Sequence, residues 1–185
     1  MARKEVITRE LILNGAFDMA KEQGVMMVTA RKLADKIGCS TQPIFRIYSK
    51  MDDLLKELFD QTRQYYEAYY ESYEKKNEVP FVDLGLAYIK FSQEEPKLFE
   101  ILFLSKHDDD QTMYDLINGS NHQGFVINEI KRIKNADPDQ IGQIFMKIFT
   151  FIHGIACMSI SGEFDLSEEE IVTMLEDAYH AFAGQ

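Results

Sequence analysis

Residues 28–55, VTARKLADKIGCSTQPIFRIYSKMDDLL, carry the clearest structural signal in this chain. They predict two short helices across a tight turn, followed directly by a third helix. Thr29 is a good N-cap for the first helix. Gly38 stands where the chain must turn, because glycine takes a positive φ there without strain. Ser40 can cap the second helix, with Pro43 in its first turn, where a missing N–H costs little.

The apolar side chains of the two short helices fall on one face of each helix. Those expected to point inward are Leu33, Ala34, Ile37, Ile44, Ile47 and Tyr48. The second helix then exposes Thr41, Gln42, Phe45 and Arg46. This is the layout of a helix-turn-helix, whose second helix is built to enter the major groove of DNA.

The distribution of charge favours the same partner. The chain of 185 residues has a net charge of -11, which by itself argues against nucleic acid. Residues 1–50, however, hold nine basic and five acidic side chains, whereas residues 51–185 hold 11 basic and 26 acidic ones. A basic head on an acidic body localises the attraction for phosphates, so we expect double-stranded DNA at the head. The alternative is that both halves are ordinary solvated surfaces.

Capping signals predict helices along the rest of the chain. Thr8 and Gly24 are expected to bound the first helix. A box at Ser49 and Asp52 opens a long helix that runs to about residue 76, and Ser167 with the glutamate three residues on opens the last helix. Further helices are expected near residues 80–94, 96–104, 110–134 and 138–161.

The expected fold is therefore all-α, with about nine helices. Residues 1–50 form a three-helix DNA-binding head with the helix-turn-helix. Residues 51–185 form a larger helical bundle for effector binding and dimerisation. The chain is long enough for such a head and a core of its own in the body.

Membrane and secreted proteins do not fit this sequence. No apolar run approaches the roughly 20 residues of a membrane span, and residues 1–10 are too polar for a signal peptide. Cys39 and Cys157 are the only cysteines. They favour reduced thiols and a cytoplasmic protein without a membrane partner.

Enzymatic and metal chemistry are not expected either. The stretch His107-Asp-Asp-Asp110 lacks the spacing and the glycine of a calcium loop, and it is better interpreted as a loop and a helix cap. The histidines show no zinc-ligand spacing, and no nucleophile elbow or phosphate-binding glycine loop occurs. We expect no catalytic residue, no metal and no cofactor; an enzyme would need turnover that depends on His153 or on the acidic loop.

A pattern known from one family runs through residues 8–55. The matching positions are Thr29, Leu33, Ala34, Gly38, Cys39, Ser40, Ile44, Phe45, Tyr48, Asp52, Asp53 and Leu54. In these positions the chain resembles the TetR-type transcriptional regulators. The resemblance implies an all-α homodimer with three-helix DNA-binding heads and a ligand-responsive helical body. Beyond residue 55 it extends only to length, helix number and loose patterns such as FIHGI at residues 151–155.

The chain departs from the family pattern at two positions. The family often has tyrosine where Phe45 stands, and that hydroxyl typically meets a DNA phosphate. It usually has lysine, another phosphate contact, where Met51 stands. Lys50, one residue away, is the expected substitute for that lysine. Both departures concern the anchoring of the DNA backbone more than the reading of bases.

The exposed face of the second short helix supplies the expected base contacts, which are Thr41, Gln42, Pro43 and Arg46. Arginine binds guanine bidentately, glutamine pairs with adenine, and an apolar side chain can meet a thymine methyl group. Contacts to the DNA backbone are expected from Thr29, Arg31, Phe45, Tyr48, Lys50 and Lys4, the last on a short arm before the first helix. The alternative is an exposed helix face without a partner.

The body is expected to bind an unknown small-molecule effector. Its candidate lining consists of large, mostly apolar side chains at helical spacing, namely Tyr66, Tyr69, Tyr70, Phe91, Phe99, Phe103, Phe125, Met146, Phe149 and His153. The alternative is that these side chains are plain core, with His153 as a hydrogen-bonded core residue.

A homodimer is expected because the helix at residues 138–161 is apolar nearly all round. A helix without a polar face must be buried on both sides, so one side needs a partner. The expected interface comprises Ile144, Ile148, Ile155, Ser159, Ile171, Met174, Leu175 and Tyr179. A symmetric dimer also matches a palindromic operator.

Together these features predict a homodimeric transcriptional repressor that a small ligand releases from its operator. The alternative is a helical ligand-binding or interaction protein in which DNA binding is weakened or lost, and it rests on Phe45 and Met51.

Overall fold

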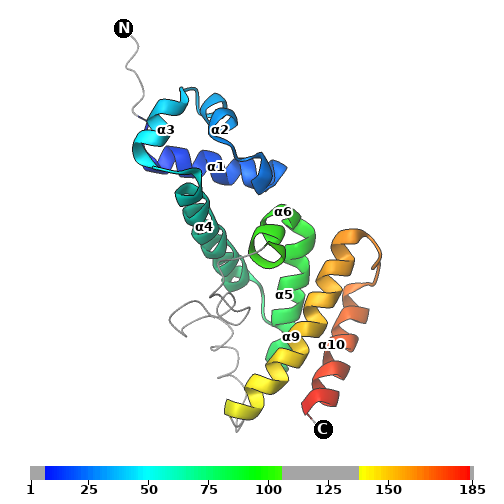
Figure 1. Ribbon diagram of the computed structural model, residues 1–185. Helices are drawn as coiled ribbons and strands as arrows, with labels where there is room; N and C mark the ends of the chain where they lie inside the picture. Colours follow the sequence, from blue (N-terminus) through cyan, green and yellow to red (C-terminus); the bar gives the residue numbers. More distant parts are fainter. Residues whose placement is uncertain (1–6, 106–137, 184–185) are drawn as a thin grey trace. The chain divides into compact units, whose positions relative to one another are not determined.

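The computed structural model describes residues 7–105 and 138–183, except for the side chains of residues 138–143. Within these ranges the chain forms eight α-helices and no strand, which confirms the all-α fold (Figure 1). They are α1 Arg9–Gln23, α2 Ala30–Lys36, α3 Thr41–Ile47, α4 Met51–Ser72, α5 Pro80–Glu94, α6 Pro96–Phe99, α9 Pro138–Ser161 and α10 Glu168–Ala183. A 3-10 turn, Val25–Met27, follows α1, and a π-helical turn, Glu100–Leu104, follows α6. The helix expected at residues 110–134 lies outside the described residues.

The described residues divide into two compact units. The head unit holds the residues up to Tyr65 together with Lys97–Ser105, and the body unit holds Tyr66–Pro96 and residues 138–183. The boundary between the two units therefore lies inside α4, whereas the predicted boundary was residue 50. The long helix α4 ends at Ser72, about one turn earlier than expected.

Local capping explains where the helices of the head unit begin. Thr8 caps α1, because its Oγ1 accepts a hydrogen bond from the Leu11 amide at 3.1 Å. Thr29 caps α2 in the same way. Gly38 has a φ of 69°, as the turn of a helix-turn-helix requires, and Ser40 stands at the N-cap position of α3 without a side-chain cap hydrogen bond. The helix boundaries predicted for the helix-turn-helix are thus confirmed.

The three helices of the head meet around a small, tightly packed core. Its fully buried side chains include Ile12, Ala16, Leu33, Ile44 and Leu54. Gly15 lies where α1 crosses α2, and a Cβ atom built there would lie 2.6 Å from Cγ2 of Ile37 and 3.2 Å from Cδ1 of Leu33. This crossing therefore depends on the absence of a side chain at residue 15.

Gly15→Ala is expected to lower the free energy of unfolding by about 1–3 kcal/mol, because the added methyl group overpacks the α1–α2 crossing. Urea denaturation followed by far-ultraviolet circular dichroism measures the change. Asp18→Ala is the matched control, since Asp18 is exposed on the same helix and its replacement should change stability by less than about 0.5 kcal/mol. Equal effects of the two substitutions would show that the crossing relaxes freely.

The body unit packs α5 against α9 and α10, which lie side by side in Figure 1. Residues 81–89 of α5 are all buried, so this helix forms the centre of the unit. At Gly85 a Cβ atom would lie 2.8 Å from Cδ1 of Leu175 and 3.1 Å from Ile152, which allows three helices to meet closely. The predicted capping box of α10 is present, because the side chains of Ser167 and Glu170 bond each other's backbone amides.

Candidate functional site

Helix α3 presents the side chains predicted to read DNA. Thr41, Gln42, Phe45 and Arg46 are exposed, and Pro43 is half-buried. On the opposite side, Ile44 is fully buried. The four predicted base-contact residues thus lie on a short helix whose other face is anchored in the head core. The contacts themselves are a proposal.

The residues predicted to meet the DNA backbone have different surroundings. Thr29, Arg31 and Lys50 are exposed around α2 and the end of α3. Phe45 is 47 % exposed and carries no hydroxyl, and Met51 is half-buried. The predicted contact from Lys4 lies outside the described residues.

The start of α4 is capped differently from the prediction. Ser49 was expected to pair with Asp52, but its hydroxyl donates to Oδ2 of Asp53 at 2.6 Å. The same oxygen accepts the amide of Lys50 at 3.2 Å. These bonds, led by the one from Ser49, hold the pKa of Asp53 below its ordinary value. The carboxylate at residue 53 rather than 52 therefore fixes the backbone that carries Lys50.

A three-residue contact, which we call the Glu57 clamp, joins α1, the end of α3 and α4. The hydroxyl of Tyr48 donates to Oε2 of Glu57 at 2.6 Å. The Arg9 guanidinium donates to both oxygens of the same carboxylate, with Nε at 2.9 and 3.1 Å. Arg9 also lies over the Tyr48 ring, with its Cζ atom 4.7 Å from the ring centre.

The clamp corrects one predicted DNA contact. Tyr48 is only 1 % exposed and its hydroxyl is bonded to Glu57, so we leave it out of the DNA-binding surface. Burial and the bond to Glu57 raise the pKa of Tyr48 to about 12. The hydrogen bond from Arg9 is the main cause that lowers the pKa of Glu57. Tyr48 serves as a packing and positioning residue for α3.

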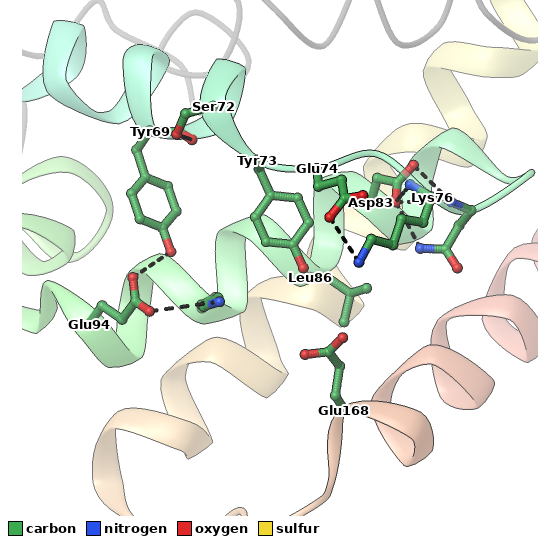
Figure 2. A pocket seen from close by; sticks show the side chains of 11 residues that line it. Tyr69, Ser72, Tyr73, Glu74, Lys76, Asp83, Leu86, Glu94 and Glu168 are labelled. Carbon is green, nitrogen blue, oxygen red and sulfur yellow. Dashed lines mark hydrogen bonds and ion pairs between the residues drawn. The ribbon is translucent and has the colours of Figure 1, made fainter.

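The body unit contains an open hollow of about 420 Å³. Its lining comes from the end of α4, the loop after it, α5 and the first residue of α10, namely Tyr69, Ser72, Tyr73, Glu74, Lys76, Asn77, Asp83, Leu86, Lys90, Glu94 and Glu168 (Figure 2). An adjoining hollow of about 190 Å³ adds Ile89, Gln93, Leu166 and Ile171. The lining of the larger hollow is mostly polar, whereas the expected effector site was mostly apolar.

The predicted lining residues mostly lie elsewhere. Of the ten, Tyr69 lines the larger hollow. The core of the body takes up Tyr66, Tyr70, Phe91 and Phe149, while Phe99 and Phe103 are buried in the head unit. Met146 is exposed, and Phe125 lies outside the described residues. A stripe of large side chains at helical spacing was therefore core in most positions.

His153 is a hydrogen-bonded residue next to the body core, as the alternative interpretation held. Its Nδ1 lies 2.9 Å from the Tyr88 hydroxyl, and its Nε2 lies 3.5 Å from Sγ of Cys157. Burial lowers the pKa of His153 and raises that of Cys157. Burial thus favours the neutral form of each of these two side chains.

One wall of the larger hollow is fixed by a buried carboxylate. Asp83 is fully buried, and its Oδ1 accepts the amides of Lys76 and Asn77 at 3.1 and 3.2 Å and the Asn77 side-chain amide at 2.8 Å. Figure 2 shows these bonds at the loop end of the hollow. The loop between α4 and α5 is therefore anchored to α5 by the carboxylate of Asp83.

The expected dimer residues separate into two groups. Ile148, Ile155, Ile171 and Leu175 are buried within the single chain, so they belong to its own core and not to an interface. Ile144, Ser159, Met174 and Tyr179 are half-buried. The outward side of α9 instead exposes a stripe at every fourth residue, formed by Met146, Thr150, Gly154 and Met158.

Two further features of the described residues bear on membranes and metals. Against the expectation from the sequence, Ile144–Ser161 of α9 is long and apolar enough to cross a membrane, although core helices of soluble proteins share this property. In residues 7–105 and 138–183, no group of three or more His, Cys, Asp or Glu side chains could hold a metal ion. The stretch at residues 107–110 lies outside these ranges.

In a comparison with known proteins, the fold of this chain is similar to that of a solved structure. No family model matches the sequence, and no curated protein matches it. A TetR-like transcriptional regulator from Rhodococcus sp. RHA1 has a similar structure, with a TM-score of 0.58 over 97 % of this chain and 100 % of that chain. The two sequences are 16 % identical, so the likeness concerns the fold.

Proposed function

We propose that this chain is a cytoplasmic, DNA-binding transcriptional regulator of the TetR type. The observation that carries the proposal is α3, a short helix that exposes Thr41, Gln42 and Arg46 while Ile44 anchors it in the head core. That arrangement suits a recognition helix in the major groove. The excess of basic over acidic side chains in residues 1–50 and the fold shared with a known regulator support it.

In the proposed complex, Thr41, Gln42 and Arg46 contact base edges and Pro43 contacts a thymine methyl group. Thr29, Arg31 and Lys50 contact phosphates, with Lys4 as a further contact from the N-terminal arm, and the phenyl ring of Phe45 lies against the sugar–phosphate backbone. Phosphate contacts set the register of the head on DNA, and base contacts set the sequence.

The regulator is proposed to act as a homodimer. The exposed stripe at residues 146, 150, 154 and 158 of α9 consists of methionine, threonine and glycine, which permits another helix to pack closely. The half-buried residues Ser159 of α9 and Met174 and Tyr179 of α10 are proposed to contribute to the same interface. A second copy placed there would give two heads for the two halves of a palindromic operator.

We propose further that the regulator is a repressor and that an effector in the body releases it from DNA. The head unit includes Lys97–Ser105, although the residues just before this segment belong to the body unit. This segment and α4 therefore continue from the body into the head. An effector that binds one arrangement of the two heads more tightly than another would raise the population of the arrangement that it prefers. Release from DNA follows if the preferred arrangement does not fit the operator.

Selection from a random pool of double-stranded DNA tests the proposed function. An enriched palindrome whose affinity falls steeply with salt supports a sequence-specific regulator. The absence of enrichment, together with a flat salt dependence, favours an alternative: a ligand-binding or interaction protein with weakened DNA binding. The exposed Phe45 and the half-buried Met51 are the observations that favour this alternative.

Phe45→Tyr is expected to tighten DNA binding by about 1 kcal/mol, because the added hydroxyl can donate to a phosphate oxygen. The gain should be similar for all DNA sequences and should leave the salt dependence unchanged, since a neutral group releases no counterion. Fluorescence anisotropy with specific and scrambled duplexes measures both quantities. A gain limited to the specific duplex would place Phe45 against a base instead.

A further inference from the structure

We propose that the larger hollow of the body unit binds an organic cation, an amine that carries an aromatic or alkyl group. We propose as well that this cation is the effector of the regulator, and this second step rests on the function proposed above. The hollow is formed by α4, α5, α10 and the loop at residues 73–77 (Figure 2).

The charge of the lining favours a cation. It contains the carboxylates of Glu74, Asp83, Glu94 and Glu168 and the ammonium groups of Lys76 and Lys90. Each lysine is already held by a carboxylate: Lys76 lies 2.9 Å from Glu74, and Lys90 lies 3.9 Å from Glu94. An anionic ligand would have to break these pairs, whereas a cation enters a site with negative charge in excess.

Glu168 is the carboxylate best placed to meet the cation. Asp83 is fully buried and occupied by the loop amides, whereas Glu168 is exposed at the start of α10. Figure 2 shows the Glu168 carboxylate and the Tyr73 hydroxyl pointing into the same space beside Leu86. Burial and the carboxylates of Glu168, Asp83 and Glu94 raise the pKa of Tyr73, which reports the same negative field.

Two tyrosine rings provide the second half of the recognition. Tyr69 is held in place because its hydroxyl donates to Oε2 of Glu94 at 2.8 Å. The ammonium group of Lys90 already lies over the ring of Tyr73, 5.9 Å from the ring centre. Aromatic faces next to carboxylates attract ammonium groups by cation–π interaction as well as by charge.

The adjoining hollow indicates the chemistry of the uncharged part of the ligand. It shares Tyr73, Leu86, Lys90, Glu94 and Glu168 with the larger one. It adds the apolar side chains Ile89, Leu166 and Ile171. A ligand that spans both hollows would place its positive nitrogen by Glu168 and its apolar group against these side chains.

Isothermal titration calorimetry of the full chain with 2-phenylethylamine tests the site without DNA. The amine is expected to bind more tightly than two molecules of similar shape, the neutral 2-phenylethanol and the anionic 3-phenylpropanoate. Binding of the anion equal to or tighter than that of the amine overturns the proposal, as does the absence of any binding by the amine.

Two variants locate the binding. Glu168→Gln removes the charge but keeps the shape, and it is expected to weaken amine binding by about tenfold. Glu169→Gln is the matched control, because Glu169 is exposed in the same first turn of α10 and lines neither hollow. Equal losses in the two variants would show a general effect of helix charge and would overturn the assignment to the hollow.

The effector role is tested separately, on the DNA that the random-pool selection enriches. Saturating amine should weaken operator binding by wild-type protein, and the concentration required should rise about tenfold for Glu168→Gln. Amine binding without any change in operator affinity refutes the effector role but leaves the site standing. Failure of the selection to enrich DNA refutes the proposed function while calorimetry still reports on the hollow.

Discussion

Glu57→Ala is expected to lower the free energy of unfolding of the chain by about 2 kcal/mol. The Glu57 carboxylate accepts hydrogen bonds from the Tyr48 hydroxyl and from the Arg9 guanidinium. Tyr48 is only 1 % exposed. Removal of the Glu57 carboxylate leaves a buried hydroxyl without this partner, and such a loss costs roughly 1–3 kcal/mol. Urea denaturation measures the loss, and hydrogen exchange of residues 41–48 shows whether it is centred on α3.

A second variant separates the hydrogen bond from simple packing. In a Tyr48→Phe background there is no hydroxyl to satisfy, so Glu57→Ala should cost about 1 kcal/mol less than in the wild type. An undiminished loss in that background would mean that Glu57 acts independently of Tyr48, and the clamp would then not be a unit.

The pH dependence of this stability has a definite sign. The pKa of Glu57 is lowered in the folded chain, chiefly by Arg9. Its contribution is therefore present above the pKa of the unfolded chain and is lost as the pH falls through the folded value. The stability difference between wild type and Glu57→Ala should shrink in acid, and a difference that grows below about pH 4 would contradict this account.

Arg46→Ala is expected to weaken binding to the selected operator by about 1–3 kcal/mol and to relax the sequence preference at one position. The reason is the exposed place of Arg46 on α3, from which a guanidinium can bond two acceptors of a guanine. Anisotropy titrations with the operator and with single-base variants measure the affinity and the preference.

Arg46→Lys is the control for charge. Lysine keeps the positive charge but lacks the planar fork, so the variant should retain nonspecific binding and still lose discrimination at that position. Full recovery of both properties by lysine would show that Arg46 meets a phosphate and reads no base.

The elements that could be predicted are those set by neighbouring residues. Thr8, Thr29 and Gly38 act within four residues of their own position, and each lies at the predicted helix boundary. The inward and outward faces of α3 follow from the positions of its apolar residues. In a helix of only seven residues, the helical period places these apolar side chains on one side, which is the side that is buried.

The features that sequence reasoning missed depend on distant partners. Arg9 and Glu57 are 48 residues apart, and nothing local marks either as the partner of Tyr48. The hollow likewise brings together α4, α5 and the first residue of α10. The prediction that one side of α9 packs within its own chain did not say which residues that side holds: Ile148 and Ile155, assigned to the dimer face, are buried in the single chain, because an apolar stripe does not say which helix covers it.

Helix α4 has a mechanical consequence because it continues without a break past Tyr65, where the two units divide. With 22 residues it is about 33 Å long. If a rigid helix of that length tilts by about 5° around one of its ends, the other end moves sideways by about 3 Å. That displacement approaches the spacing of successive base pairs, so a small tilt would put the proposed DNA-binding head out of register with DNA.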